Sequence, residues 1–292
     1  MGDILVGTAS WTDRSLIKSG WYPSGVNTAE ARLEHYASRF PLVEVDSTYY
    51  FPPSADVARR WAERTPEHFV FNIKAFSLLT QHPTRAEAIP RDLPRPPDKA
   101  RLYPKDLEAG VIEEVWERFL TALEPLDEVG KVGALLFQFP PWFTLRSSNK
   151  RYLLDCVQQA RPLRICVEFR NQSWLSEENR AETIDFLEGY DIAYVCVDMP
   201  QGFRSSVPPV VAATSELGVV RFHGHNDAEW ESGSVQRRFA YLYREEELRS
   251  WVPRLRALSE QTATTHVLMN NCHQDWAQRN AADLTELLDQ AR

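Results

Sequence analysis

The chain has 292 residues, of which 43% are hydrophobic and 25% charged, and its formal net charge is −8. The length and composition are ordinary for a globular protein with a full-sized core. A uniformly acidic protein repels nucleic acid and anionic membrane, so either partner would require a local basic patch.

The termini and cysteines predict a cytoplasmic protein. Residues 1–5 lack the basic region and long apolar run of a signal peptide. The longest strongly apolar stretch, residues 132–141, is too short to span a bilayer. The four cysteines form no CxxC pair, which argues against a zinc knuckle or a redox motif and for structural, reduced thiols.

Short β-rich runs alternate with amphipathic stretches along the chain. The predicted strands are residues 4–10, 42–48, 69–75, 132–139, 164–170, 192–198, 218–223 and 265–271. The predicted helices are residues 28–40, 55–65, 111–126, 150–160, 177–189, 245–260 and 277–288. After the sixth strand, residues 207–213 offer at most a short turn of helix.

Eight strands with intervening helices predict an α/β protein, a (β/α)₈ TIM-type barrel forming one domain over residues 1–292. A doubly wound open sheet is the alternative, and its usual GxGxxG fingerprint is missing. Residues 80–110 interrupt the alternation, with six of the 19 prolines and no helical or strand period. This segment is interpreted either as a solvated insertion or as a lid over the barrel mouth.

Side chains alternate along a strand, and in a barrel one set meets the helices while the other points to the axis. The apolar side chains of each strand are taken to face the helices, and this assumption determines which residues of the strand face the axis. In the sixth strand, for example, Val195 and Val197 are expected to face out and Asp198 in. The expected inward polar set is Thr8, Ser10, Glu44, Asp46, Asn72, Lys74, Gln138, Glu168, Arg170, Asp198, Arg221, His223 and Asn270.

The polar members gather near the C-terminal strand ends, where TIM barrels place their chemistry. The structural alternative is a self-satisfied salt-bridge network that plugs the barrel. Aromatic residues in loops after the strands favour a pocket, because flat aromatic walls beside polar groups suit sugars or nucleobases. They include Trp11, Trp21, Tyr49, Trp142, Trp174, Trp230 and Trp276.

The chain resembles the YecE-like family, catalogued as domain of unknown function 72 (DUF72), over nearly its whole length. The matching motifs include Gly20-Trp21-Tyr22-Pro23, the run from Val43-Glu44-Val45-Asp46 to Tyr50, Leu79-Thr80-Gln81-His82, Gln138-Phe139-Pro140-Pro141, Val167-Glu168-Phe169-Arg170, Arg221-Phe222-His223-Gly224 and Asn270-Asn271. The resemblance implies a TIM-type barrel and no agreed activity. The first loop departs from the family's frequent GTSGW, because it reads Gly7-Thr8-Ala9-Ser10-Trp11.

The leading hypothesis is an enzyme, of hydrolase or isomerase/lyase type, acting on a small polar, sugar- or phosphate-containing substrate. Glu44 and Glu168 are candidate base and acid, Lys74 a stabiliser of negative charge, and His223 a further proton-transfer group. The candidate substrate-binding residues are Trp11, Asp46, Tyr49, Gln138, Arg170, Asp198, Arg221, Asn270 and Asn271. The sequence requires no cofactor.

Two other classes stay open. One is a metal-dependent hydrolase or nuclease like endonuclease IV, in which a divalent metal would be held by some of Glu44, Asp46, Glu168, Asp198, His223, His225 and His273. The other is a non-catalytic ligand-binding barrel, which predicts that every carboxylate in the pocket pairs with Lys or Arg. The acidic balance disfavours nucleic acid but leaves single strands open. No membrane partner is expected, and the oligomeric state is undetermined.

Overall fold

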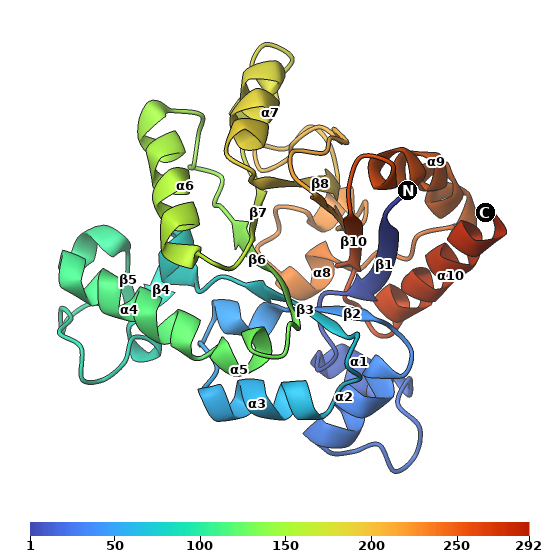
Figure 1. The fold of residues 1–292 in the computed structure, drawn as a ribbon, viewed down its shortest axis with the longest axis horizontal. Coiled ribbons are helices and arrows are strands. Elements are labelled where there is room, and N and C mark those ends of the chain that lie inside the picture. The colour runs from blue at the N-terminus through green and yellow to red at the C-terminus, as the bar shows by residue number, and fades with distance from the viewer. Residues whose placement is uncertain (292) are drawn as a thin grey trace.

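Eight parallel strands close into a barrel in the order β1-β10-β9-β8-β7-β6-β3-β2 (Figure 1). The computed structural model describes residues 1–291 and, within them, every side chain except those of residues 235 and 236. The barrel strands are β1 (Asp3–Thr8), β2 (Leu42–Val45), β3 (Val70–Lys74), β6 (Val132–Gln138), β7 (Ile165–Glu168), β8 (Ala193–Asp198), β9 (Leu217–Phe222) and β10 (Thr264–Met269). This is the predicted TIM-type barrel.

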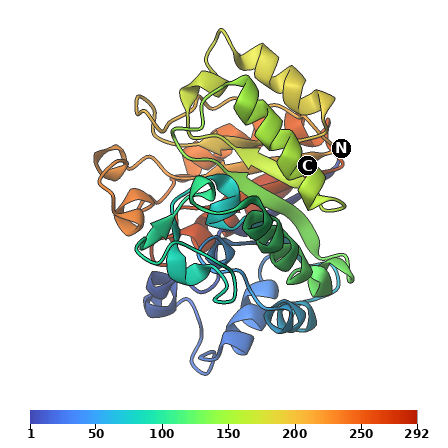
Figure 2. The ribbon, with the colours of Figure 1, turned by 90° about the vertical axis from the view of Figure 1, so that its left-hand side faces the viewer.

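Helices surround the strands, and the two termini lie close together in both ribbon views (Figures 1 and 2). The helices are α1 (Arg14–Ser19), α2 (Ala29–Ala37), α3 (Ala55–Glu63), α4 (Ala109–Thr121), α5 (Glu124–Asp127), α6 (Ser147–Ala160), α7 (Arg180–Gly189), α8 (Val235–Arg238), α9 (Glu245–Ser259) and α10 (Trp276–Gln290). Within residues 1–291, every helix is too short or too polar to cross a lipid bilayer.

Large aromatic side chains join the outer faces of the strands to the helices. Phe137 of β6 stacks on Trp116 of α4, with ring centroids 5.7 Å apart. Phe222 of β9 meets Trp251 of α9 edge-on at 4.9 Å. Because both outer-face rings are fully buried, the hydrophobic effect holds the helices against the barrel. The alternate residues of the same strands are thereby turned toward the axis.

The registers confirm most of the predicted inward set, but β8 is inverted. Asp198 pairs with Phe222, and Val197 pairs with Arg221. Since paired residues of neighbouring strands share a face, Asp198 lies on the outer face and Val197 on the inner one. The prediction was wrong because β8 is apolar on both faces, so alternation carried no information about its register.

Strand β1 needs the same correction. The Thr8 hydroxyl lies 2.9 Å from the Tyr36 hydroxyl of α2, so Thr8 faces the helices. Strand β2 ends at Val45, earlier than the predicted strand over residues 42–48. The chain continues there as the 3₁₀ turn η1 (Asp46–Tyr49). The Thr48 hydroxyl favours this turn because it bonds the carbonyl oxygens of Val45, at 2.8 Å, and Lys74, at 2.6 Å.

The insertion at residues 80–110 is more ordered than its composition suggested. Strands β4 (Thr84–Arg85) and β5 (Arg101–Leu102) pair antiparallel within it, beside the 3₁₀ turns η3 (Ala86–Ala88) and η4 (Pro104–Asp106). Figure 2 shows this segment in front, folded against the barrel. The predicted helix 111–126 is two helices, α4 and α5, and Pro125 lies in the first turn of the second. Residues 199–216, which join β8 to β9, form no helix, in agreement with the prediction of at most a short helical turn there.

Candidate active site at the barrel mouth

A buried ionic network joins three strands inside the barrel. Arg221 of β9 donates from Nη2 to Glu44 Oε1 of β2 at 2.5 Å, and from Nη1 to Glu168 Oε2 of β7. All three side chains are fully buried. The Arg221 guanidinium therefore lies between the two carboxylates and neutralises part of their charge. Buried charged groups are costly unless they are paired in this way.

Glu168 has further partners on its second oxygen. Arg170 Nε donates to Glu168 Oε1 at 2.5 Å, and His223 Nε2 lies 3.2 Å from the same oxygen. Asn270 Nδ2 lies 2.8 Å from His223 Nδ1, and Arg170 Nη2 lies 3.2 Å from His223 Nε2, so the ring is held between these two side chains. Two arginines thus engage both oxygens of Glu168, and the His223 ring lies beside one of these oxygens.

Glu44 is less well satisfied. Its Oε2 is buried and has no hydrogen-bond partner within residues 1–291. Burial, together with the nearby Asp46 carboxylate, raises the pKa of Glu44 to about 7 against the opposing effect of Arg221 and Lys74. Burial also acts to raise the pKa of Glu168, but Arg170 and Arg221 outweigh it and hold that pKa well below its usual range. Near neutral pH Glu44 is therefore populated in both its protonated and its ionised form, whereas Glu168 is ionised, although both pair with Arg221.

The imidazole of His223 is neutral. Burial lowers its pKa to about 3, with Arg170 and Arg221 opposing its protonation although Glu168 favours it. Because a ring with this pKa carries no proton to give up at pH 7, His223 has a positioning role beside Glu168 and Arg170 rather than an acid role.

Solvent reaches the network on the side of β2, β3 and β6. Lys74 Nζ lies 3.0 Å from Asp46 Oδ1, with side chains 14% and 31% exposed. The ammonium also lies 5.1 Å from the centre of the Tyr49 ring. Gln138, at the end of β6, is partly exposed and accepts a long hydrogen bond of 3.5 Å from Arg170. A substrate would approach the buried carboxylates past these residues.

The other side of the mouth is closed by the segment between β9 and α9. Trp230 is 1% exposed, and the Arg170 guanidinium lies 5.6 Å from the centre of its ring. Phe239 lies 5.8 Å from the His223 ring. From the sequence, Trp230 was expected only to be an aromatic residue in a loop, and its role as a cover was missed. Its position after a barrel strand was the available signal.

His82 was also missed as a site residue. Its ring lies 5.3 Å from Tyr49 and 6.0 Å from Trp142, which is 49% exposed. Burial, with the charges of Lys74 and Arg170, lowers the pKa of His82 to about 3. Beyond Trp142, a cavity of about 540 Å³ is lined by Gln81, Tyr103, Pro104, Lys105 and Trp142. The motif that contains His82 lies in the connection after the C-terminal end of β3, and this was the signal that could have found it.

Three of the proposed substrate-binding residues lie outside this cluster. Trp11 packs edge-on against Trp61 of α3 at 5.7 Å, on the helix side of the barrel. Asn271 is fully buried and donates to the Tyr241 carbonyl at 2.8 Å and to Asn280 Oδ1 at 2.9 Å. Their side chains are occupied in joining the barrel to its helices, because both residues point away from the axis.

The outward Asp198 forms a separate group at the rim. Its Oδ2 accepts from the Tyr243 hydroxyl at 2.7 Å and lies 2.8 Å from His225 Nε2. The hydrogen bond to Asp198 raises the pKa of His225, whose side chain is 36% exposed. Asp198 thus orients a histidine beside the mouth rather than lining the barrel itself.

The candidate metal ligands are not gathered at one point of the barrel mouth. Within residues 1–291, no three His, Cys, Asp or Glu side chains are grouped as a metal ion would require. Glu44 and Glu168 share Arg221, while Asp198 and His225 belong to the separate rim group. The arrangement of these donors does not fit a metal centre.

Comparison with known proteins identifies the family. The sequence model of "Protein of unknown function DUF72" matches residues 5–292. The chain is 34% identical to the UPF0759 protein YunF of Bacillus subtilis (strain 168), over 98% of this chain and 95% of that protein. Crystal structures of DUF72 proteins are similar as well. One from Enterococcus faecalis V583 has 26% identity and a TM-score of 0.81, covering 98% of this chain and 95% of its own. One from Thermotoga maritima MSB8 has 28% identity and a TM-score of 0.78, covering 98% and 99%. The chain belongs to the DUF72 family.

Proposed function

We propose that the barrel mouth is an active site that moves protons on a small polar, sugar- or phosphate-containing substrate. The observation that carries this proposal is the contrast between Glu44 and Glu168 on the shared Arg221. One carboxyl group has a pKa of about 7 and an unpartnered oxygen, whereas the other is held ionised by its partners. Environments that drive two carboxyl pKa values apart are typical of acid and base assignments.

In this proposal Glu44 exchanges the proton. A group whose pKa lies near neutrality is populated in both forms and can accept a proton from the substrate and return it. Lys74, the partly exposed cation beside it, would stabilise negative charge that develops on a substrate oxygen or would bind a phosphate group. Glu168 keeps Arg221 and Arg170 in place. The substrate would enter between Tyr49 and Gln138, where the mouth is partly exposed.

The test uses proton exchange rather than net turnover, because the substrate is unidentified. The purified protein is incubated in D₂O with a panel of aldoses, ketoses and their phosphates, and ¹H NMR records conversion and loss of carbon-bound protons. Wild type is expected to exchange or convert at least one compound. Glu44→Gln is expected to slow that reaction by about 10²- to 10⁴-fold. Glu188→Gln, at an exposed position on α7, is the matched control.

Two results would contradict the proposal: no reaction with any member of the panel, or an equal rate in Glu44→Gln. Circular dichroism and urea melts of each variant show whether a loss of activity comes from unfolding or from the missing carboxyl group. Addition of EDTA tests the metal-dependent alternative, since that class loses activity with a chelator. Saturable binding of a panel compound with no exchange would instead favour a non-catalytic barrel.

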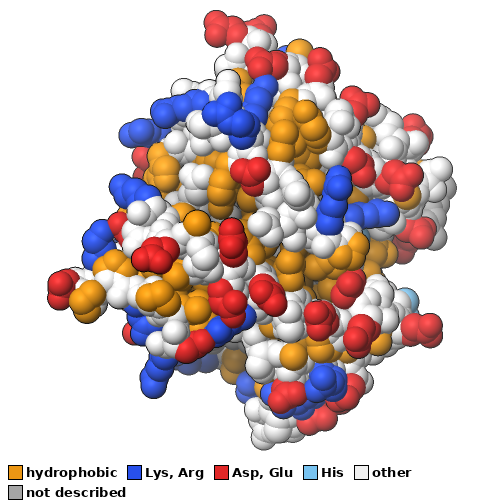
Figure 3. Space-filling view, turned by 60° about the vertical axis from the view of Figure 1, so that its left-hand side comes forward, with side chains coloured by type: hydrophobic (Ala, Val, Ile, Leu, Met, Phe, Trp, Pro, Cys, Tyr) orange, Lys and Arg blue, Asp and Glu red, His pale blue; other side chains and the backbone are white. Residues whose placement is uncertain are grey.

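The non-catalytic barrel is the second candidate. It is supported by the pairing of the pocket carboxylates with cations, as this candidate predicts: Glu168 pairs with Arg170 and Arg221, Glu44 with Arg221, and Asp46 with Lys74. It leaves unexplained the second oxygen of Glu44, Oε2, which is buried and has no hydrogen-bond partner within residues 1–291. The charges on the face shown in Figure 3 are mixed, with acidic side chains spread among basic and apolar ones. This mixture gives no support to a nucleic-acid partner on that face.

A further inference from the structure

The cavity beside the barrel mouth has no part in the proton transfer proposed above. Its volume is about 540 Å³, within the usual range for small-molecule sites, and its lining consists of Gln81, Tyr103, Pro104, Lys105 and Trp142. Trp142 follows β6, whereas the other four residues belong to the connection between β3 and α4. One loop of the barrel and the insertion at residues 80–110 therefore form its two walls.

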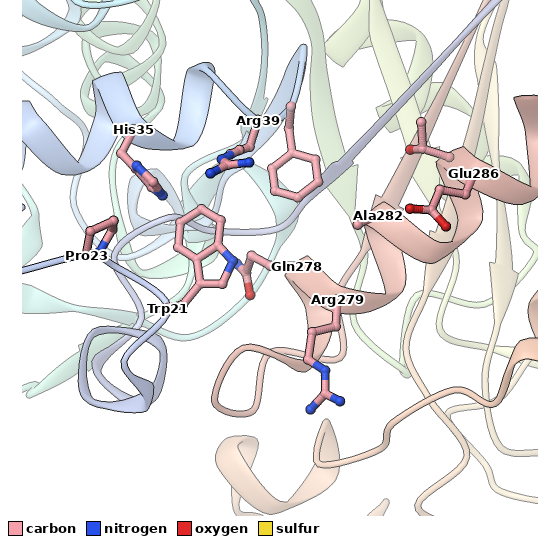
Figure 4. Close-up of a pocket in the computed structure, with 10 residues that line it drawn as sticks. Trp21, Pro23, His35, Arg39, Gln278, Arg279, Ala282 and Glu286 are labelled. Carbon is pink, nitrogen blue, oxygen red and sulfur yellow. The ribbon is translucent and has the colours of Figure 1, made fainter.

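A second cavity of similar volume, about 550 Å³, lies between α2 and α10 and offers a ligand less (Figure 4). Its two arginines, Arg39 and Arg279, point away from each other in Figure 4, so they do not converge on one ligand. The indole of Trp21 stacks on the Phe40 ring at a centroid distance of 6.3 Å, which covers one of its faces. The cavity beside Trp142 is the better candidate because its aromatic surface is open.

A row of rings leads from this cavity to the barrel mouth. The Tyr49 ring lies 5.1 Å from Lys74 Nζ and 5.3 Å from the His82 ring. The His82 ring in turn lies 6.0 Å from Trp142. Burial lowers the pKa of His82 to about 3, so this ring is neutral at pH 7. A ligand that reaches from Lys74 into the cavity would therefore pass along an uncharged aromatic surface.

Trp142 presents an open face to such a ligand. Its side chain is 49% exposed, although large apolar side chains are mostly buried in folded proteins. The His82 ring meets the indole at 66° and so does not stack flat on it. The Asn171 side chain donates to the Pro141 carbonyl at 2.6 Å, which holds the loop just before Trp142. The indole is thus a positioned flat apolar surface against which a ligand ring can pack.

Gln81 supplies a polar group beside the indole, in a backbone conformation that glutamine rarely adopts. It follows the 3₁₀ turn η2 (Ser77–Thr80) with a φ of +62°, in the left-handed region that favours glycine. Its side chain is partly exposed, and its amide makes no hydrogen bond within residues 1–291. Because an amide both donates and accepts, it suits the hydroxyl groups of a ligand. A glutamine where glycine would be relaxed indicates a use for its side chain.

On the basis of the proton-transfer function proposed above, we propose that this cavity binds a second sugar ring of the substrate. The substrate is then a disaccharide or a longer glycan rather than a free monosaccharide. Its terminal unit would lie at the mouth near Lys74. The next unit would pack its C–H face on Trp142 and exchange hydrogen bonds between its hydroxyl groups and the Gln81 amide.

The lining favours a sugar over a nucleobase or an anion. The rings of Tyr49, His82 and Trp142 stand at 81° and 66° to one another, so they form no pair of parallel walls that would enclose a flat base. The one charged residue of the lining, Lys105, is exposed, and its ammonium lies 5.6 Å from the centre of the Tyr103 ring. The polar group nearest to Trp142 in this proposal is therefore an uncharged amide.

The test is isothermal titration calorimetry with D-glucose, maltose and cellobiose. At least one disaccharide is expected to bind about tenfold more tightly than glucose. Trp142→Ala should remove this difference, because it weakens disaccharide binding about tenfold and changes glucose binding less than about twofold. Tyr190→Ala, at a 54% exposed aromatic residue at the end of α7, is the matched control and should leave both affinities unchanged.

Gln81→Gly separates binding from stability. Glycine removes the amide and relaxes the left-handed backbone, so disaccharide affinity should fall about three- to tenfold while the melting temperature stays the same or rises. A fall in the melting temperature together with the affinity would show that Gln81 serves the fold, and this result would count against the proposal.

No saturable binding of either disaccharide, or binding that Trp142→Ala leaves unchanged, would overturn the proposal. Tighter binding of adenosine 5′-monophosphate than of both disaccharides, lost in Trp142→Ala, would assign the cavity to a flat base and overturn it as well. Proton exchange on free monosaccharides that Glu44→Gln slows, without any preference for disaccharides, would refute the sugar subsite and leave proton transfer standing. A disaccharide preference that depends on Trp142, with no exchange in any compound, would retain the subsite and refute proton transfer.

Discussion

The raised pKa of Glu44 has a consequence for stability that does not require knowledge of the substrate. The perturbation is Glu44→Gln, which keeps the size of the side chain and removes its titration. In wild type the pKa of Glu44 rises from its ordinary value of 4.5 to about 7 when the chain folds. The folded state therefore binds this proton more tightly than the unfolded state does, and its stability falls as pH rises through this window.

The magnitude follows from the size of the shift. A change of one pKa unit corresponds to 1.36 kcal/mol, so the shift of Glu44 is worth about 3 kcal/mol in total. This contribution is present below pH 4.5 and is lost above about pH 7. Between pH 5 and pH 8, wild type should lose about 2–3 kcal/mol of unfolding free energy that Glu44→Gln retains.

The assay is urea unfolding of both proteins between pH 5 and pH 8, followed by tryptophan fluorescence. The difference between the two proteins is the quantity to plot, because buried histidines act in the opposite direction. His223, with a pKa lowered from 6.5 to about 3, contributes stability above pH 6.5 that is lost as pH falls. That loss is common to both proteins and cancels in the difference.

A difference between wild type and Glu44→Gln that stays constant from pH 5 to pH 8 would refute this reasoning. It would mean that Arg221 and Lys74 compensate the burial of Glu44 completely, so that the carboxylate is ionised throughout. The proposed proton-transfer role would then lose its main support. A difference that grows in favour of wild type at high pH would show that the pKa of Glu44 is lowered instead of raised.

Three further predictions concern other parts of the molecule. Arg221→Met should lower the free energy of unfolding by about 3–5 kcal/mol, measured by urea unfolding at pH 7, because it leaves Glu168 buried beside one arginine only; a loss under about 1 kcal/mol would contradict the network. Gly133→Ala should cost about 1–3 kcal/mol in thermal melts, since the added methyl carbon would lie within 2.5–2.7 Å of the side chains that fill the base of the barrel; an unchanged melting temperature would show that this layer is loosely packed. Asp198→Asn should lower the pKa of His225 toward 6.5 in an NMR titration, because the carboxylate hydrogen bond is the main cause of the raised value; an unchanged pKa would exclude Asp198 as its cause.

The alternation of strands and helices was readable from the sequence because each element carries its own periodicity. β9 shows why the site could be anticipated in part: Arg221 interrupts an otherwise apolar strand, so its face was determined by its neighbours. The same logic placed Glu44, Lys74 and Glu168 toward the axis. It failed in β8, where both faces are apolar, so that alternation could not tell the inner face from the outer one.

Local pattern, then, determined the barrel, the order of its elements and most of the polar residues that point inward. Only the closed sheet determined which charged side chains pair. Glu44 and Arg221 are 177 positions apart in the sequence, yet Glu44 Oε1 lies 2.5 Å from Arg221 Nη2. The contrasting pKa values of Glu44 and Glu168 arise from these distances and from burial, and neither is encoded locally. The closure of the mouth by Trp230 depends in the same way on long-range packing, which no periodicity records.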